Sequence, residues 1–135
     1  MRTHNRLLAF LLTTLLLAAC GASKTTNFAG TYTYQSNGTP AEIVRVTKTG
    51  DTWTIQAKSG NTWGDLQAVH TATAYDKATV FGTAWRDIAE DGLVNPNGGI
   101  FRIKPGSIVH GHAFPSGYVF MTMLGLVPVE QLPQP

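Results

Sequence analysis

The sequence predicts an all-β protein, built as a small antiparallel barrel or sandwich of about eight short strands. Two observations lead to this prediction. Runs of β-branched and aromatic residues recur after residue 27, and clusters of Gly, Asn, Asp, Ser and Pro separate them at short intervals. Only the segment 86–92 (RDIAEDG) favours a helical turn, with Gly92 as its stop. The short connections favour a meander-like order of strands.

The first half of the domain carries three strand patterns. Residues 30–34 (GTYTY) are rich in β-branched and aromatic residues and precede a turn at Ser36-Asn37-Gly38. Residues 41–49 and 52–58 flank the turn at Gly50-Asp51, and 52–58 alternates between apolar and polar side chains. We therefore expect 52–58 to be a half-buried strand that forms a hairpin with 41–49.

The middle of the chain predicts two more strands and one long connection. Residues 66–75 place apolar and small side chains at alternate positions, together with His70, and residues 78–85 (ATVFGTAW) are rich in apolar and β-branched residues. Residues 86–99 combine the helical turn with the turn sequence NPNGG. We expect this stretch to be the longest departure from strand and a lid or contact loop.

The last third predicts a second hairpin and a final strand. Residues 99–104 and 107–114 flank the turn at Pro105-Gly106, and 118–124 (YVFMTML) is so apolar that it should be covered on both faces. Residues 127–135 are rich in proline and predict a loose or edge-capping tail. The β domain is therefore expected to span residues 28–126.

The charged residues exclude one class of partner. The chain of 135 residues has ten Lys+Arg, eight Asp+Glu and one Cys. Arg2 and Arg6 precede the domain, and the remaining basic and acidic residues are equal in number. No basic run or stripe is left, so nucleic acid is not an expected partner.

The N-terminus has the features of a secretory signal peptide. Arg2, His4 and Arg6 are followed by an uncharged apolar run over residues 7–19. A membrane-spanning helix needs roughly 20 apolar residues, so this run is too short to be a stable span. Small residues at its end, up to Ala19, are typical of a cleavage site.

The tetrapeptide Leu17-Ala18-Ala19-Cys20 resembles the lipobox of bacterial lipoproteins. The resemblance implies that residues 1–19 are a lipoprotein signal peptide, cut between Ala19 and Cys20, and that the Cys20 thiol carries acyl chains. The alternative is an ordinary secretory leader with a chance cysteine at its end. Cys20 is the only cysteine of the chain, so an internal disulfide is excluded, and lipidation accounts for a lone thiol in an exported protein.

The resemblance also implies a location in the cell envelope. Gly21 follows Cys20, whereas Asp at that position commonly keeps lipoproteins at the inner membrane, so we expect an outer-membrane protein that faces the periplasm. Residues 20–27 are small and polar and predict a flexible tether. Stable anchoring needs two or more acyl chains.

A second, fainter resemblance concerns the start of the domain. Phe28-Ala29-Gly30-Thr31-Tyr32 resembles the Gly-x-Trp first strand of lipocalin-type barrels, with Tyr32 where that family has Trp. It implies a barrel architecture and nothing about a ligand. For the alternative of a small-ligand carrier, the expected lining residues of a lipocalin-like cavity are Trp53, Phe120, Met121 and Met123.

Three histidines form the best candidate for a metal site. His110 and His112 are two apart on a predicted strand, which would place them on one face, and His70 comes from another strand. Such a trio can bind zinc with an open fourth position. The alternative is that the imidazoles are hydrogen-bonded or partly wet surface groups, and no cofactor is expected.

The sequence contains no motif that names a reaction. No Gly-x-Ser-x-Gly elbow precedes a helix, and the single thiol is assigned to lipid. Asp87, Glu90 and Asp91 cluster in the helical turn, where a solvated turn explains them better than a catalytic pair. We therefore expect a non-enzymatic protein.

Several aromatic and turn residues are candidates for contact with a protein partner. Trp63 and Trp85 stand beside turns, and Ser116-Gly117-Tyr118 forms a Ser-Gly loop. The first hypothesis is a lipid-anchored envelope protein that recognises a protein partner through such loops, as inhibitors and immunity proteins do. The alternatives are a lipocalin-like carrier of a small apolar ligand, a His-dependent metal-binding protein and a structural component of the envelope.

Overall fold

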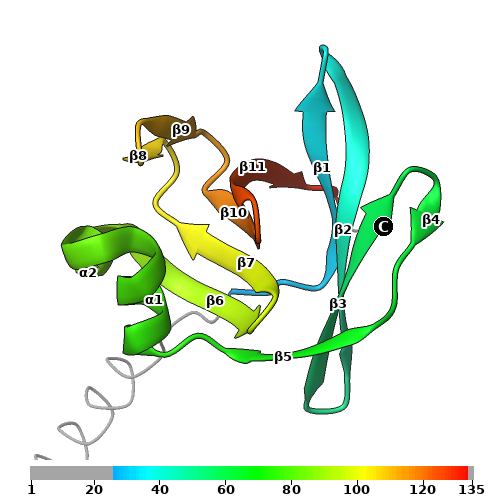
Figure 1. Cartoon of the computed structure of the whole chain (residues 1–135), viewed down its shortest axis with the longest axis horizontal. Coiled ribbons are helices and arrows are strands. Elements are labelled where there is room, and N and C mark those ends of the chain that lie inside the picture. The colour runs from blue at the N-terminus through cyan, green and yellow to red at the C-terminus, as the bar shows by residue number, and fades with distance from the viewer. Residues whose placement is uncertain (1–25, 134–135) are drawn as a thin grey trace, which may run out of the picture.

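The computed structural model describes residues 26–133, which form a closed barrel of eight antiparallel strands with a helical segment against its outside (Figure 1). The all-β prediction is confirmed. The predicted signal peptide, Cys20 and most of the tether lie outside the described residues. In order around the wall, the barrel strands are β1 (Gly30–Ser36), β2 (Thr39–Thr49), β3 (Thr52–Ser59), β5 (Gln67–Thr71), β6 (Ala89–Asn95), β7 (Gly98–Ile103), β10 (Tyr118–Thr122) and β11 (Gly125–Gln131).

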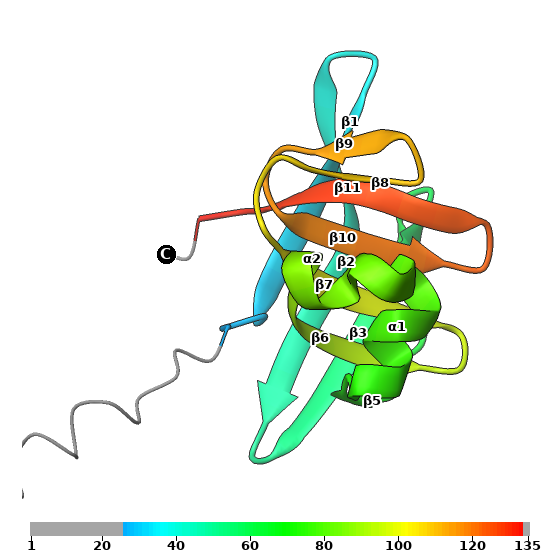
Figure 2. The same ribbon diagram turned by 90° about the vertical axis from the view of Figure 1, so that its left-hand side faces the viewer.

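The barrel closes where its first and last strands meet. β1 pairs with β11 through Tyr32 with Gln131 and Thr33 with Glu130, while the remaining neighbours follow one another along the chain. Beyond this seam the β1–β2 hairpin projects from the barrel as an arm (Figures 1 and 2). Outside the wall, β4 (Thr62–Trp63) pairs with the end of β3, and β8 (Ser107–Val109) pairs with β9 (His112–Phe114).

The predicted strand over residues 78–85 is wrong, because this part of the chain is helical. The strand expected over 66–75 ends at Thr71, and α1 (Ala74–Phe81) follows, continued by η1 (Gly82–Ala84) and α2 (Trp85–Ile88). Thr73 and Asp76 start α1 with a capping box, in which the Thr73 N–H donates to Asp76 Oδ2 at 2.8 Å and the Asp76 N–H donates to Thr73 Oγ1 at 3.2 Å. This cap outweighs the strand preference of the β-branched residues behind it.

The predicted lid over residues 86–99 is wrong as well. Only α2 (Trp85–Ile88) corresponds to the expected helical turn at 86–92, and residues 89–95 form β6, which is hydrogen-bonded to β5 and β7. Leu93 and Val94 are 3% and 4% exposed, as expected of a buried strand. The acidic residues Asp87, Glu90 and Asp91 precede them in the sequence and favoured the prediction of a turn. This stretch is a wall of the barrel, followed by the tight turn to β7.

The proline-rich tail is a strand. β11 covers Gly125–Gln131 and closes the barrel, so the domain does not end at residue 126. Pro128 lies opposite Val119 of β10, and on its other side β11 contacts β1 only further along, at Glu130 and Gln131. Proline is tolerated there because that side of the strand needs no N–H donor.

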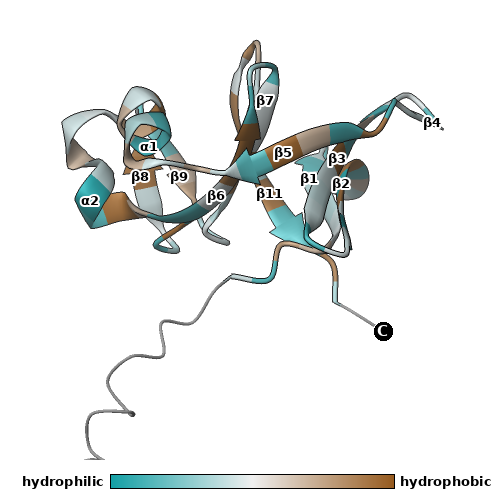
Figure 3. Ribbon diagram, turned by 90° about the horizontal axis from the view of Figure 1, so that it is seen from below, coloured by the Kyte–Doolittle hydropathy of each residue, from teal (hydrophilic) through white to brown (hydrophobic). Residues whose placement is uncertain are grey.

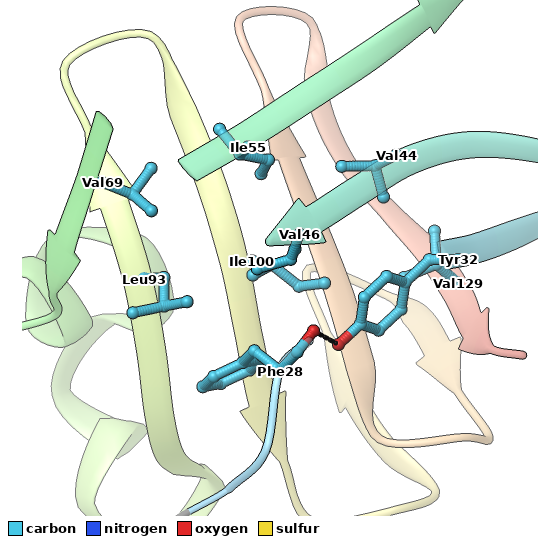
Figure 4. Close-up of a cluster of buried hydrophobic side chains, with 9 residues drawn as sticks. All are labelled: Phe28, Tyr32, Val44, Val46, Ile55, Val69, Leu93, Ile100 and Val129. Carbon is cyan, nitrogen blue, oxygen red and sulfur yellow. Dashed lines mark hydrogen bonds between the residues drawn. The ribbon is translucent and has the colours of Figure 1, made fainter. Parts of the chain in front are cut away.

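The inward-facing side chains of the barrel form one core (Figure 4). Alternation along each strand directs every second side chain inward, as the fold class requires. The largest of them, Tyr32, is 0% exposed, and its hydroxyl donates a hydrogen bond to the Phe28 carbonyl at 2.7 Å. The buried members of this core are Phe28, Tyr32, Val44, Val46, Ile55, Val69, Leu93, Ile100 and Val129.

A second core lies on the outside of the wall. The outward faces of β6, β7 and β10 are apolar too, and the helices together with β8 and β9 cover that side of the barrel, away from β4 (Figures 2 and 3). Phe81 of α1 contacts Phe101 of β7 edge to face, with 5.1 Å between ring centroids. The strands β7 and β10 are therefore apolar on both faces because both faces are covered.

The two cores and all barrel strands lie within the described residues, so a fragment that starts at residue 26 contains the complete fold. In this part of the chain, no helix is long and apolar enough to cross a bilayer.

Replacement of Tyr32 by Phe tests how far the buried hydroxyl stabilises the barrel. Tyr32→Phe removes the donor to the Phe28 carbonyl and should lower the free energy of unfolding by about 1–2 kcal/mol. Urea denaturation followed by tryptophan fluorescence measures the change. The matched control is Tyr34→Phe on the same strand, a residue that is 40% exposed and whose change should stay within about 0.5 kcal/mol. Equal effects of the two substitutions would contradict the assignment.

Removal of the α1 cap should have a pH-dependent effect. Hydrogen bonds from Thr73 hold the pKa of Asp76 below its ordinary value. A carboxyl with a lowered folded-state pKa stabilises the fold above its unfolded pKa of about 3.9, and this stabilisation is lost as pH falls through the folded pKa. Asp76→Ala should therefore lower the stability at pH 7, by less than about 1 kcal/mol because solvent screens this exposed carboxylate, and by less still in acid.

The pH dependence of this effect has a matched control in α2. Asp87 lies in the first turn of that helix, which has no side-chain cap, so Asp87→Ala should change stability little at any pH. Thermal unfolding at pH 7 and at pH 3 compares the two variants. A loss for Asp76→Ala that is the same at both pH values would show that the charged carboxylate is not what stabilises α1.

Candidate functional site

The two ends of the barrel differ in what fills them. At one end, which we call the closed end, the segment before β1 folds across the opening and Phe28 enters the core. The rings of Phe28 and Tyr32 each contact Tyr118 edge to face, at 6.4 and 5.3 Å between centroids. Thr26 fixes this segment, because its N–H and its Oγ1 donate to Asp91 Oδ2 at 3.0 and 2.6 Å. Aromatic side chains thus plug this end.

The other end, which we call the mouth, opens into a pocket of about 340 Å³. The mouth contains the β6–β7 turn, the β10–β11 turn and the segment between β3 and β5. The deeper wall of the pocket is apolar and the rim is polar, as is usual for small-molecule sites of roughly 300–1,000 Å³. The apolar wall comprises Ile43, Ile55, Ala57 and Phe120, and the polar rim comprises Lys58, Gln67, Asn95, Asn97 and Thr122.

Two small residues, Ala57 and Gly99, line the pocket where their strands reach the mouth. Ala57 shares the inward face of β3 with Ile55 but is exposed to solvent. Gly99 carries no side chain, and a Cβ there would clash with the Leu93 carbonyl oxygen. Glycine is therefore required at position 99 for the close approach of β6 and β7.

Amide side chains form a hydrogen-bonded group on the rim. Asn95 Oδ1 accepts from the backbone N–H groups of Asn97 and Gly98 at 2.8 and 3.1 Å, which shapes the β6–β7 turn. Asn95 Nδ2 donates to the Ala68 carbonyl at 3.1 Å and to Gln67 Oε1 at 3.3 Å. These contacts hold the turn against β5, so this part of the rim is preorganised.

A group of charged and aromatic side chains gathers around Trp63 of β4, beside the end of β3. The Arg45 guanidinium carbon lies 4.1 Å and Lys58 Nζ lies 5.4 Å from the ring centroid of Trp63. Lys58 Nζ is also 3.7 Å from Glu42 Oε2. We refer to Glu42, Arg45, Lys58 and Trp63 as the Trp63 cluster. It contains two cations and one carboxylate, so its net charge is positive, and Lys58 connects it to the pocket.

The predicted cavity residues lie at this site with one exception. Phe120, Met121 and Met123 line the pocket. Trp53 does not; it packs against the inner core, and Lys48 Nζ lies 5.3 Å from its ring centroid. The sequence did not indicate Lys58, Gln67, Asn95 or Asn97 as pocket residues. The NPNG turn was recognisable, but nothing in the sequence placed it beside Gln67.

The predicted partner-binding residues are distributed over the molecule. Trp63 lies on β4, whereas Trp85 starts α2 on the far side of the barrel, where it packs on the outer core (Figure 1). Ser116, Gly117 and Tyr118 form the corner that leads into β10. Ser116 Oγ donates to the Val129 carbonyl, and the Ser116 carbonyl accepts from Arg102 Nη1 at 2.8 Å. The structure thus does not bring these candidates together.

The histidines do not have the arrangement that the metal hypothesis requires. His110 and Gly111 have φ values of 49° and 80° and form the turn between β8 and β9, so the strand predicted over 107–114 is interrupted there. His110 Nε2 lies 3.2 Å from the Val80 carbonyl oxygen, and His70 Nε2 lies 3.6 Å from Asp76 Oδ2. Within residues 26–133, no three His, Cys, Asp or Glu side chains gather as a metal site.

Compared with protein-family models, with curated proteins and with solved structures, the chain gives no match. What the mouth can do therefore follows from its own geometry. Burial raises the pKa of Tyr32 well above its ordinary value, and this residue, like Asp76, does not line the pocket. The chemistry that the mouth offers is apolar surface with hydrogen-bonding and cationic groups at its edge.

Proposed function

We propose that this protein binds a small apolar ligand in the mouth of its barrel, in the manner of a lipocalin-like carrier, without catalysing a reaction. The observation that carries the proposal is the asymmetry of the barrel. The closed end is plugged by Phe28, Tyr32 and Tyr118, while the mouth leaves a pocket of about 340 Å³ with an apolar wall and a polar rim. A pocket of this size suits a short acyl chain or a single ring system.

A protein partner at the mouth is the second candidate. Met123 and Leu124 form the tip of the β10–β11 turn and are 87% and 100% exposed. The Leu124 N–H donates to Thr122 Oγ1 at 3.1 Å, so the turn that presents these side chains is ordered. Large apolar side chains at a fixed tip are suited to contact with another protein. The function would then be of the inhibitor or immunity type that the sequence suggests. The contact with the partner would be made by the β10–β11 tip and not by the Ser116-Gly117-Tyr118 loop.

The location that we propose is the outer membrane, facing the periplasm, with acyl chains on Cys20. The described chain begins at Thr26, which is fixed at the closed end. Residues 20–25 can span at most about 20 Å when fully extended. A lipid on Cys20 would therefore keep the closed end near the membrane, and the mouth would face away from it.

Ligand binding can be tested by blocking the mouth. Ala57→Trp places a large side chain on an inward-facing, exposed position of the pocket wall, and it should lower the affinity for an apolar fluorescent dye at least tenfold. The measurement is a dye titration of the fragment 26–135, followed by displacement of the dye with decanol. The matched control is Ala113→Trp, an exposed position on β9 outside the pocket. Dye affinity that is unchanged by Ala57→Trp, or absent in the parent fragment, would contradict the proposal.

Lipidation can be tested on the full chain in a bacterial host. Cells labelled with radioactive palmitate should incorporate label into the protein, and Cys20→Ala should abolish the label because the chain has no other cysteine. The same substitution should leave an uncut precursor, and Ser23→Ala should change neither result. Label that persists in Cys20→Ala, or a processed but unlabelled parent chain, would favour the ordinary secretory leader.

A further inference from the structure

We infer that the ligand of the mouth is an amphiphile with one short apolar chain and a carboxylate head, and that Lys58 selects the head. This inference rests on the proposed function and specifies its ligand class. It is drawn from three features of the pocket lining: the apolar wall, the Lys58 ammonium group and the amide N–H₂ group of Gln67.

The charge at the edge of the pocket favours an anionic head. Within the Trp63 cluster, Glu42 opposes only one of the two cations, and Arg45 and Lys58 both lie within 6 Å of the same ring. Lys58 lines the pocket, and its side chain is 23% exposed. A carboxylate in the mouth would meet a net positive charge in a half-buried setting, where screening by water is reduced.

The contact between Lys58 and Glu42 can be exchanged for a contact with a ligand. Lys58 Nζ and Glu42 Oε2 are 3.7 Å apart, which exceeds the length of a charge-assisted hydrogen bond, and the Glu42 side chain is 43% exposed. Ion pairs of this kind contribute little to stability. Lys58 can therefore turn one of its three N–H donors to a ligand at small cost.

Gln67 supplies a second donor at the same edge. Its Oε1 accepts from the side-chain amides of Asn95 and Asn97, at 3.3 and 3.5 Å, which fixes the orientation of the amide group. Among the described residues, its Nε2 group has no hydrogen-bond partner. Gln67 and Lys58 both line the pocket, so its lining contains an amide N–H₂ group as well as an ammonium group.

The interior of the pocket favours an apolar chain as the part of the ligand that enters it. Ile43, Ile55 and Phe120 form its wall, and the polar groups of the pocket stand on the rim. A sugar or another polyhydroxylated ligand would lose its hydrogen bonds with water against this wall, which is unfavourable. An apolar chain that enters first, with its head left at the rim, matches both surfaces.

The test compares two ligands that differ only in the head. Decanoate and decanol compete with an apolar dye for the fragment 26–135 and for its Lys58→Met and Lys48→Met variants. We expect the parent fragment to bind decanoate about tenfold more tightly than decanol, because an ammonium–carboxylate contact strengthens only the former. Lys58→Met should remove this preference, so that the variant binds decanoate and decanol with equal affinity.

Lys48 provides a matched control for Lys58. It belongs to the same hairpin, its Nζ lies 5.3 Å from the ring centroid of Trp53, and it does not line the pocket. Lys48→Met changes the net charge equally and should leave the preference intact. Circular dichroism melting curves establish that each variant is folded.

The outcomes separate the inference from the proposed function. Equal affinity of the parent fragment for decanoate and decanol overturns the inference and leaves the apolar carrier standing. A preference that Lys48→Met reduces as much as Lys58→Met shows a general charge effect and also overturns it. If neither compound displaces the dye, the inference and the proposed function fail together.

Discussion

The structure depends on the hydrogen bond that joins the buried Tyr32 hydroxyl to the Phe28 carbonyl, 2.7 Å apart. It holds the segment before β1 against the barrel, with the Phe28 ring in the core. Without the ring, the core would contain a cavity at this position. Gln131 reinforces the contact, since its Nε2 donates to the Tyr32 hydroxyl and to the carbonyls of Asn27 and Ala29. One network therefore ties β1, β11 and the N-terminal segment together at the seam that closes the barrel.

This network makes the two ends of the barrel unequal, and the ligand binding that we propose depends on this difference. Aromatic rings fill the closed end, whereas the small and exposed residue Ala57 lines the mouth. The seam itself consists of two residue pairs, and the arm formed by the β1–β2 hairpin extends beyond it. A barrel sealed at one end and open at the other can hold a ligand without exposing its main core to water.

The strands were predictable to the extent that alternation and turn chemistry mark them. The hairpin of 41–49 and 52–58 was expected and is β2 and β3, because each strand has one wet face. The segment 78–85 misled because Thr79, Val80 and Phe81 favour strands locally, while the Thr73–Asp76 cap and the contact of Phe81 with Phe101 stabilise a helix. For residues 89–95 and 127–131 the error was the opposite one, because strands were predicted as a loop and a tail. The acidic residues of the first segment and Pro128 of the second are unusual in strands, yet both segments pair within the barrel.

The sequence by itself determined the all-β class, most strand positions, the lipobox-like motif at Cys20 and part of the pocket lining, namely Phe120, Met121 and Met123. These follow from local rules: side-chain alternation, turn residues and a contiguous motif. Only the tertiary structure decided which end is open and that Lys58, Gln67 and Asn95 share one rim. Those residues come from β3, β5 and β6, and their proximity results from strand pairing across the barrel, which no local pattern records.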